Sequence, residues 1–176
     1  MHKSIQNHYS KLIADYDKLL QTVNVLPAEI IYQPMQENKW SVVQTLQHLN
    51  FSFISSINYL KKKLQGDIFE YNPIAGWVRS YLLNSQLRTT KKFKAPKGLP
   101  EPIQLTTIET VTKEWNTMQS DLKQLLDELP NNLVNKNIFR HPRVGLINAS
   151  QMITFFSAHL YHHEQQIQHY LSEKKR

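Results

Sequence analysis

The sequence contains no cysteine. A chain without thiols forms no disulfide, no thiolate zinc site and no cysteine nucleophile, and it is compatible with a reducing compartment. Any reactive site must therefore be built from other side chains.

Glycine is scarce, with 4 residues among 176. This scarcity disfavours glycine-rich phosphate-binding loops and all-β architectures that depend on many tight turns. Long hydrophobic runs are lacking too, because the first residues have no signal-peptide core and no later window approaches the length of a membrane span. We expect a cytoplasmic protein with no membrane partner.

Several catalytic signatures are missing. There is no G-x-S-x-G motif, and His163-Glu164 does not begin an H-E-x-x-H motif because Ile167 occupies its last position. No two carboxylates share an apolar helix face, where a raised pKa would be expected. Serine and carboxylate mechanisms therefore have little support, and an enzyme of this sequence is expected to work through a metal.

The formal net charge is +7, and basic residues cluster at 61–63, 91–97 and 174–176. These clusters fall at predicted helix ends and in loops, where cations complement the helix dipole or keep the surface solvated. No recognition-helix or zinc-finger pattern accompanies them. We expect no nucleic-acid partner, and nucleic-acid binding is the alternative ranked last.

Apolar residues recur at three- and four-residue spacing in four stretches, which predicts long amphipathic helices over 3–23, 41–64, 106–129 and 148–171. A chain of this length is expected to form a single domain, residues 1–176. The predicted fold class is all-α, a four-helix bundle.

Capping patterns support three of these helix starts. Ser41 is a good N-cap residue, and Thr106–Glu109 and Asn148–Gln151 match the capping box.

The connections between the predicted helices differ greatly in length. The connection from the second helix to the third, residues 65–105, is long enough to let these two helices run parallel. We expect it to contain a short accessory helix within 74–88, followed by a proline-stiffened surface loop.

Residues 131–147 are predicted to be irregular. The link at 24–39 shows no clear periodicity, although residues 30–32 are expected to anchor it to the core.

Two histidines lie one turn apart on the apolar face of the fourth helix, which is made of Met152, Phe156, His159, Leu160, His163, Ile167 and Tyr170. A buried imidazole needs partners for its nitrogens, and an i, i+4 pair directs two lone pairs at one point. His48, on the second helix, is the best third ligand. Three protein ligands would leave coordination positions open, as in catalytic sites. The alternative is ordinary burial, with each histidine bonded to a carbonyl or to water.

The remaining polar residues allow two interpretations each. Gln166 is expected either to hydrogen-bond to a ligand or substrate, or to be a plain interfacial glutamine. The face beside His48 either lines a wet cavity or faces solvent; it carries Gln44, Thr45, Ser52, Ser55 and Tyr59. The other histidines are interpreted as surface or packing residues: His2, His8, His141, His162 and His169.

Two segments resemble a known family. The segment K-W-S-V-V-Q-T-L-Q-H-L is similar to W-S-x-x-E-x-x-x-H-L of the DinB/YfiT-like superfamily, and H-L-Y-H-H-E-Q-Q-I is similar to its H-x-x-x-H-x-x-Q-I segment. The loop F-K-A-P-K-G-L-P also resembles the family's segment before the third helix. The matching positions are Trp40, Ser41, His48, Leu49, His159, His163, Gln166 and Ile167.

This resemblance implies a bundle of unusual connectivity, often a homodimer, with a three-histidine site for one divalent ion, zinc or nickel. Similar proteins include thiol transferases that use bacillithiol, mycothiol or glutathione, a mycothiol-dependent isomerase, and many proteins labelled metal-dependent hydrolases. We therefore expect a thiol-dependent transferase or hydrolase that acts on small electrophilic molecules in stress or detoxification, with a low-molecular-weight thiol as a second cofactor. The alternative is a non-catalytic metal- or ligand-binding bundle with a structural or vestigial site.

Overall fold

The computed structural model describes residues 1–66, 78, 81, 82, 84, 85, 101–103, 105–141 and 145–174. The accessory helix predicted within 74–88 and the proline-stiffened loop after it lie almost wholly outside these described residues.

Long helices dominate the described chain, which confirms the predicted all-α bundle. In chain order the elements are α1 (Lys3–Asn24), α2 (Ala28–Ile31), α3 (Val42–Leu64), α5 (Ile108–Asp127), the 3-10 turn η1 (Asn131–Leu133), β1 (Phe139–His141), β2 (Gly145–Ile147) and α6 (Ala149–Lys174). Among the described residues, no helix is both long and apolar enough to cross a membrane.

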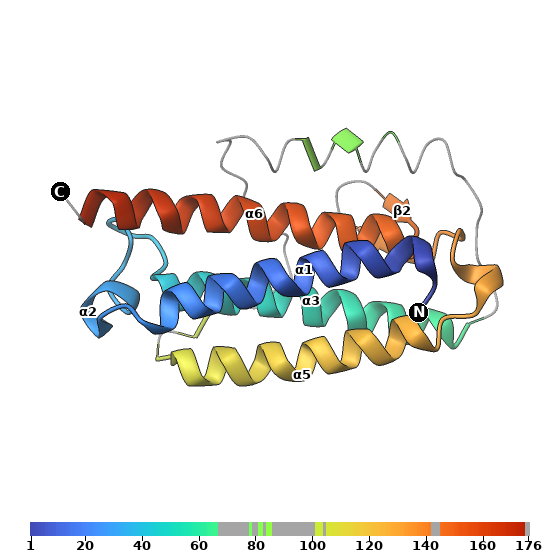
Figure 1. Ribbon diagram of the computed structural model, residues 1–176, viewed down its shortest axis with the longest axis horizontal. Helices are drawn as coiled ribbons and strands as arrows, with labels where there is room; N and C mark the ends of the chain where they lie inside the picture. The colour runs from blue at the N-terminus through green and yellow to red at the C-terminus, as the bar shows by residue number, and fades with distance from the viewer. Residues whose placement is uncertain are drawn as a thin grey trace.

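The four long helices pack as two parallel pairs (Figure 1). Helix α3 runs in the same direction as α5 and packs along it, whereas α1 and α6 pack together and run the opposite way. The predicted parallel arrangement of the second and third long helices is therefore confirmed. Helix α6 also contacts α3, and this contact brings the two histidine-bearing segments together.

The capping residues of α3 and α6 act as the sequence predicts. At α3, Ser41 Oγ accepts from the Gln44 amide at 3.2 Å while Gln44 Oε1 accepts from the Ser41 amide at 2.9 Å. At α6, the Asn148 and Gln151 side chains accept from each other's backbone amides, both at 2.9 Å. These reciprocal bonds satisfy amides that the first helical turn leaves without partners.

The predicted start of α5 is wrong by one residue. Thr107, not Thr106, is the N-cap, because its extended backbone lets Oγ1 accept from the Thr110 amide at 3.2 Å. Thr106 is buried, and its Oγ1 has no partner among the described residues. The buried side chain of Ile108 then begins the helix on its core-facing side. The predicted box with Glu109 is therefore not the cap, and α5 also ends at Asp127, two residues short of Leu129.

The prediction that residues 131–147 are irregular is wrong for two short strands. β1 and β2 form an antiparallel hairpin in the register Phe139↔Ile147, Arg140↔Leu146 and His141↔Gly145. Three residues per strand are too few to show the two-residue alternation by which strands are recognised. Gly145 has a φ of 75°, which glycine adopts readily because it lacks a Cβ.

The link after α1 contains a short helix that sequence periodicity did not indicate. Helix α2 is a single turn of four residues, too short for a 3.6-residue period to show. Ile31 is buried and Ile30 is partly buried, as predicted for an anchor. Tyr32 is 40% exposed, but its hydroxyl accepts a hydrogen bond from the Ile108 amide at 3.2 Å and so links α2 to the start of α5.

A buried aromatic and polar cluster fixes α3 against its neighbours. The rings of Tyr16 and Trp115 stack with centroids 3.7 Å apart, and Trp115 Nε1 donates to Asp17 at 2.7 Å. Tyr16 donates to Asn50 Oδ1 at 2.7 Å, and Asn50 Nδ2 donates to the Val111 carbonyl at 2.9 Å. Because polar groups buried without partners are costly, these bonds favour one register of α1, α3 and α5.

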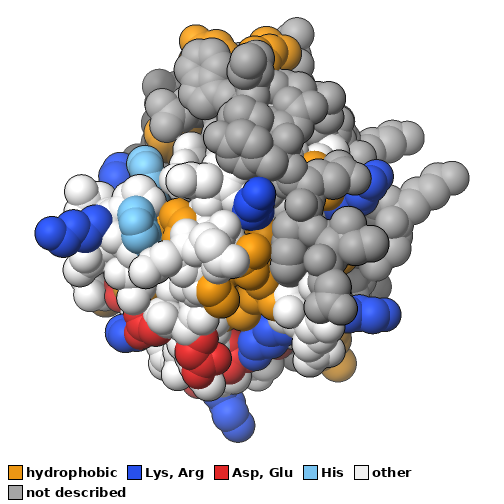
Figure 2. Space-filling view, turned by 90° about the vertical axis from the view of Figure 1, so that its right-hand side faces the viewer, with side chains coloured by type: hydrophobic (Ala, Val, Ile, Leu, Met, Phe, Trp, Pro, Cys, Tyr) orange, Lys and Arg blue, Asp and Glu red, His pale blue; other side chains and the backbone are white. Residues whose placement is uncertain are grey.

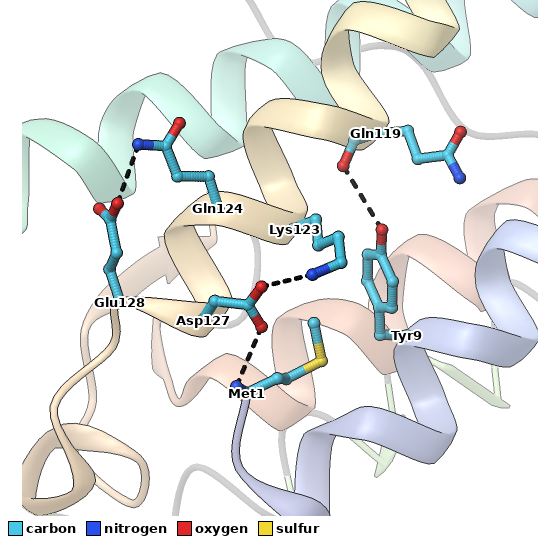
Figure 3. A network of polar contacts seen from close by, with 7 residues as sticks. All are labelled: Met1, Tyr9, Gln119, Lys123, Gln124, Asp127 and Glu128. Carbon is cyan, nitrogen blue, oxygen red and sulfur yellow. Dashed lines mark hydrogen bonds and ion pairs between the residues drawn. The ribbon is translucent and has the colours of Figure 1, made fainter.

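Polar contacts also join the start of α1 to the end of α5 (Figure 3). The backbone amino group of Met1 lies 2.9 Å from Asp127, which also pairs with Lys123, and Tyr9 donates to the Gln119 carbonyl at 3.4 Å. Figure 2 views this end of the bundle, where basic, acidic and hydrophobic side chains are interspersed. Surface ion pairs of this kind contribute little each, so the buried cluster dominates the packing.

Candidate metal centre

Helices α3 and α6 bring the three predicted histidines together. His48, His159 and His163 each offer one ring nitrogen, and these atoms all lie within 4.8 Å of one another. The Nε2 atoms of His159 and His163 are 3.1 Å apart. The His48 ring centroid lies 5.3 Å from that of His159 and 5.1 Å from that of His163. The convergence is present, and metal binding by these residues stays a prediction.

Local structure explains how each ring is placed. His159 and His163 are four residues apart on α6, so the helix itself stacks them on one face. His48 lies in the second turn of α3, whose start is fixed by the Ser41 cap. The Trp40 ring packs against the His48 ring at a centroid distance of 4.7 Å.

Burial keeps these imidazoles neutral. Only 5% of His48 and 8% of His163 is exposed. Burial lowers the pKa of His48 to about 4. Burial, followed by the charges that His48 and His162 would carry, lowers the pKa of His163 to about 3. The pKa of His159 falls well below its ordinary value for the same reasons, burial first and neighbouring histidines second. At neutral pH each ring therefore keeps a lone pair for a cation.

This donor set fits a divalent transition-metal ion. Two nitrogens bound to one ion at about 2.0–2.1 Å, with angles between square and tetrahedral, lie roughly 2.9–3.4 Å apart, and the His159–His163 pair is at 3.1 Å. The widest separation, 4.8 Å, would have to close to about 4.2 Å or less. His48 Nδ1 is buried with no hydrogen-bond partner among the described residues, so this ring is not fully satisfied by the protein groups around it.

Aromatic rings form one wall of the site. Phe155 stacks on His159 with centroids 5.5 Å apart, and Phe53 lies 6.3 Å from the same ring. The unpredicted hairpin supports this wall, because the His141 ring of β1 lies 4.4 Å from Phe155. Apolar walls lower the local dielectric and strengthen electrostatic interactions inside the site.

The other histidines divide into two groups. His2, His8 and His169 are exposed, which confirms their interpretation as surface residues. His141 and His162 are buried, and His141 packs against aromatic rings as proposed.

Gln166 is a direct neighbour of the candidate site, and its role as an outer partner of a metal ligand stays a prediction. Its Oε1 lies 2.9 Å from His163 Nδ1, and its Nε2 donates to His162 Nε2 at 3.0 Å. Sequence reasoning missed this role of His162. The signal was present, because His162 and Gln166 are four residues apart on one helix, a spacing at which side chains meet.

The polar face of α3 lies partly at the site and partly at the surface. Ser52 Oγ is 3.4 Å from His159 Nδ1, whereas Ser55 is exposed and Tyr59 is 37% exposed. Thr45 is buried and donates to the Ser41 carbonyl at 2.8 Å. Among these residues of α3, Ser52 therefore contacts one of the three histidines directly.

One comparison with known proteins gives a match. A family model described as the DinB superfamily matches residues 11–167. The matched range begins within α1 and ends within α6, so it contains all three histidines. No curated protein and no solved structure matches the chain.

Proposed function

This chain belongs to the DinB superfamily, and from that premise we propose that it is a metal-dependent enzyme in which His48, His159 and His163 bind one divalent ion, zinc or nickel. The observation that carries the proposal is the convergence of three neutral imidazoles from two helices within 4.8 Å. Imidazole nitrogens suit both ions. The proposed reaction is thiol transfer to, or hydrolysis of, a small electrophilic molecule.

The ion, when bound, supplies a positive charge that lowers the pKa of a thiol or a water molecule toward neutrality. The residues of the chain have separate tasks. The three histidines bind without having to release protons, because burial already keeps them neutral at neutral pH. Phe155 and Phe53 keep water from one side of His159.

The absence of cysteine bears on the choice of nucleophile. Because the chain has no thiol of its own, a thiol-dependent reaction requires a low-molecular-weight thiol such as bacillithiol, mycothiol or glutathione as the second cofactor. The substrate is then a small molecule with an electrophilic carbon. Homodimer formation, which the family resemblance implies, stays a prediction.

Metal content tests the site directly. Wild-type protein, His163→Ala and His169→Ala are purified identically and their zinc and nickel are measured by mass spectrometry. His169 is the matched control because it lies on the same helix with an exposed side chain. We expect about one ion per chain in the wild type and the control, and a large loss in His163→Ala, since removing one of three ligands opens the site. Equal content in all three proteins would contradict the proposed ligand set.

Product analysis separates thiol transfer from hydrolysis. Metal-loaded protein is incubated with a chlorodinitrobenzene or an epoxide, with and without each thiol, and products are identified by mass spectrometry. A thiol adduct that forms faster with wild type than with His163→Ala supports transfer. A water adduct formed without thiol supports hydrolysis.

The burial of the site favours one alternative, a non-catalytic metal-binding bundle. His48 and His163 are almost fully buried, which restricts the approach of a substrate to an ion held between them. A protein that binds the ion, gains thermal stability from it and yet forms neither product would support this alternative.

A further inference from the structure

Five side chains form a continuous line of polar contacts through the candidate site. Ser52 Oγ lies 3.4 Å from His159 Nδ1, and His159 Nε2 lies 3.1 Å from His163 Nε2. His163 Nδ1 lies 2.9 Å from Gln166 Oε1, and Gln166 Nε2 lies 3.0 Å from His162 Nε2. Every ring nitrogen of His159 and His163 takes part in this line.

The orientation of the Gln166 amide determines which atom donates and which accepts in each of these contacts. An amide oxygen only accepts and an amide nitrogen only donates, so His163 carries its proton on Nδ1 and His162 accepts at Nε2. A neutral His163 with a proton on Nδ1 has its lone pair on Nε2, the atom that faces His159. His159 must then donate from its own Nε2, which leaves its Nδ1 to accept from the Ser52 hydroxyl.

We propose that Gln166 is a positioning residue that holds His163 in the tautomer a metal ligand needs before any ion binds, so that of the two ligands on α6 only His159 has to change tautomer on binding. This inference rests on the metal site of the proposed function. To offer its Nε2 to an ion, the His159 ring would have to carry its proton on Nδ1 instead of Nε2. The Ser52 hydroxyl would then accept a hydrogen bond from His159 Nδ1 instead of donating one to it, because a hydroxyl can rotate between the two roles.

The orientation of the Gln166 amide matters because its oxygen and its nitrogen require opposite tautomers of His163. If Gln166 turned over, its nitrogen would face His163 Nδ1, and the His163 proton would have to lie on Nε2, pointing into the ion site. The amide is held at both ends by residues of its own helix, His163 three positions and His162 four positions before it. Side chains at these spacings meet on one rigid surface, and such outer partners fix the tautomer and orientation of ligating histidines.

The tautomers can be observed by nitrogen NMR of the imidazole rings in protein kept free of metal by a chelator. We expect His163 to be protonated on Nδ1 and His159 on Nε2. After addition of zinc, His159 is expected to move to the Nδ1-protonated form while His163 stays unchanged. A metal-free His163 that is protonated on Nε2, or that populates both tautomers equally, would overturn the proposal. Because this measurement needs no bound ion, it decides the question even if the proposed enzyme function fails.

Three substitutions test the effect on affinity, measured by zinc competition with a chromophoric chelator. Gln166→Met removes the acceptor and is expected to weaken zinc binding by about 10-fold or more. Gln166→Glu keeps an acceptor for His163 Nδ1 and is expected to bind at least as tightly as wild type. Gln165→Met is the matched control, because Gln165 is the exposed neighbour on the same helix, and it should leave affinity unchanged. Wild-type affinity in Gln166→Met would overturn the positioning role.

A purely structural role for Gln166 predicts a different result. If the side chain only supported the fold, Gln166→Met and Gln166→Glu would lose affinity together, in proportion to their loss of stability in urea. Rescue by glutamate alone is the outcome expected of a tautomer-fixing acceptor.

Discussion

In the second turn of α3, His48 departs from the rule that buried polar atoms are hydrogen-bonded. Its Nδ1 is buried with no partner among the described residues. The preceding residue, Gln47, is also buried but has hydrogen-bond partners, since its Oε1 accepts from the Ile103 amide at 2.8 Å and its Nε2 donates to Glu114 at 3.3 Å. Two adjacent buried polar residues on one helix therefore differ in their contribution to stability.

This contrast leads to a prediction for metal-free protein. His48→Leu removes the unsatisfied nitrogen at similar volume, and we expect the free energy of unfolding in urea, with chelator present, to stay the same or rise by about 1 kcal/mol. Gln47→Leu, the matched control, leaves the Ile103 amide without its acceptor and is expected to cost about 1–3 kcal/mol.

Zinc should reverse the order of stability of these proteins. A ligand that binds only the folded state stabilises it, so zinc should stabilise the wild type and Gln47→Leu but not His48→Leu. A large loss of stability in metal-free His48→Leu would instead show that the imidazole is needed for the fold. A residue that is neutral or unfavourable for folding and necessary for binding is typical of a functional site.

At the scale of the helices, the beginnings of α3 and α6 follow from sequence, whereas the beginning of α5 does not. Thr106 and Thr107 are adjacent and chemically identical, so residue preference alone does not choose between them. The folded structure does, because Thr106 is buried, whereas Thr107 is exposed and its Oγ1 accepts from the Thr110 amide. The hydroxyl of Thr106 is buried with no hydrogen-bond partner in the described part of the chain.

A matched pair of substitutions tests this assignment. Thr107→Ala removes the acceptor of the Thr110 amide and is expected to cost about 1 kcal/mol of the free energy of unfolding. Thr106→Val removes a buried hydroxyl at nearly equal volume and is expected to be neutral or slightly stabilising. Urea unfolding of both variants provides the check, and the opposite order would restore Thr106 as the cap.

For the molecule as a whole, the buried histidines couple stability to pH. The pKa of His48 falls from about 6.5 to about 4 on folding and that of His163 to about 3. Because these folded-state pKa values are lowered, the unfolded chain binds more protons at acidic pH. The stability associated with the neutral rings is complete above pH 6.5 and is lost progressively as the pH falls toward 4 and then 3.

We therefore expect metal-free wild type to lose roughly 1.4 kcal/mol per pH unit for each such histidine below pH 6.5. Urea unfolding in chelator at pH 7.5, 6.5 and 5.5 measures this, in a range above the titration of most carboxylates. His48→Leu should show a shallower dependence, because one titrating group is gone. A wild-type stability that does not change between pH 7.5 and 5.5 would show that the rings are not held neutral by burial.

The sequence by itself determined the parts of this protein that depend on neighbours along the chain. The long helices follow from apolar residues repeated every three or four positions, and the starts of α3 and α6 follow from the reciprocal side-chain and backbone bonds at Ser41 and Asn148. The pairing of His159 with His163 follows in the same way, because a helix places residues four apart on one face.

Only the tertiary structure decided the rest, because those features depend on residues that are distant in the chain. Ser52 meets His159 across 107 residues, and the hairpin at β1 and β2 supports the wall of the site although its strands are too short to give a sequence signal. The state of each ring nitrogen depends on which partners packing brings within about 3 Å. Local periodicity places a histidine on a face, whereas the folded surroundings determine its charge, its tautomer and its unsatisfied atoms.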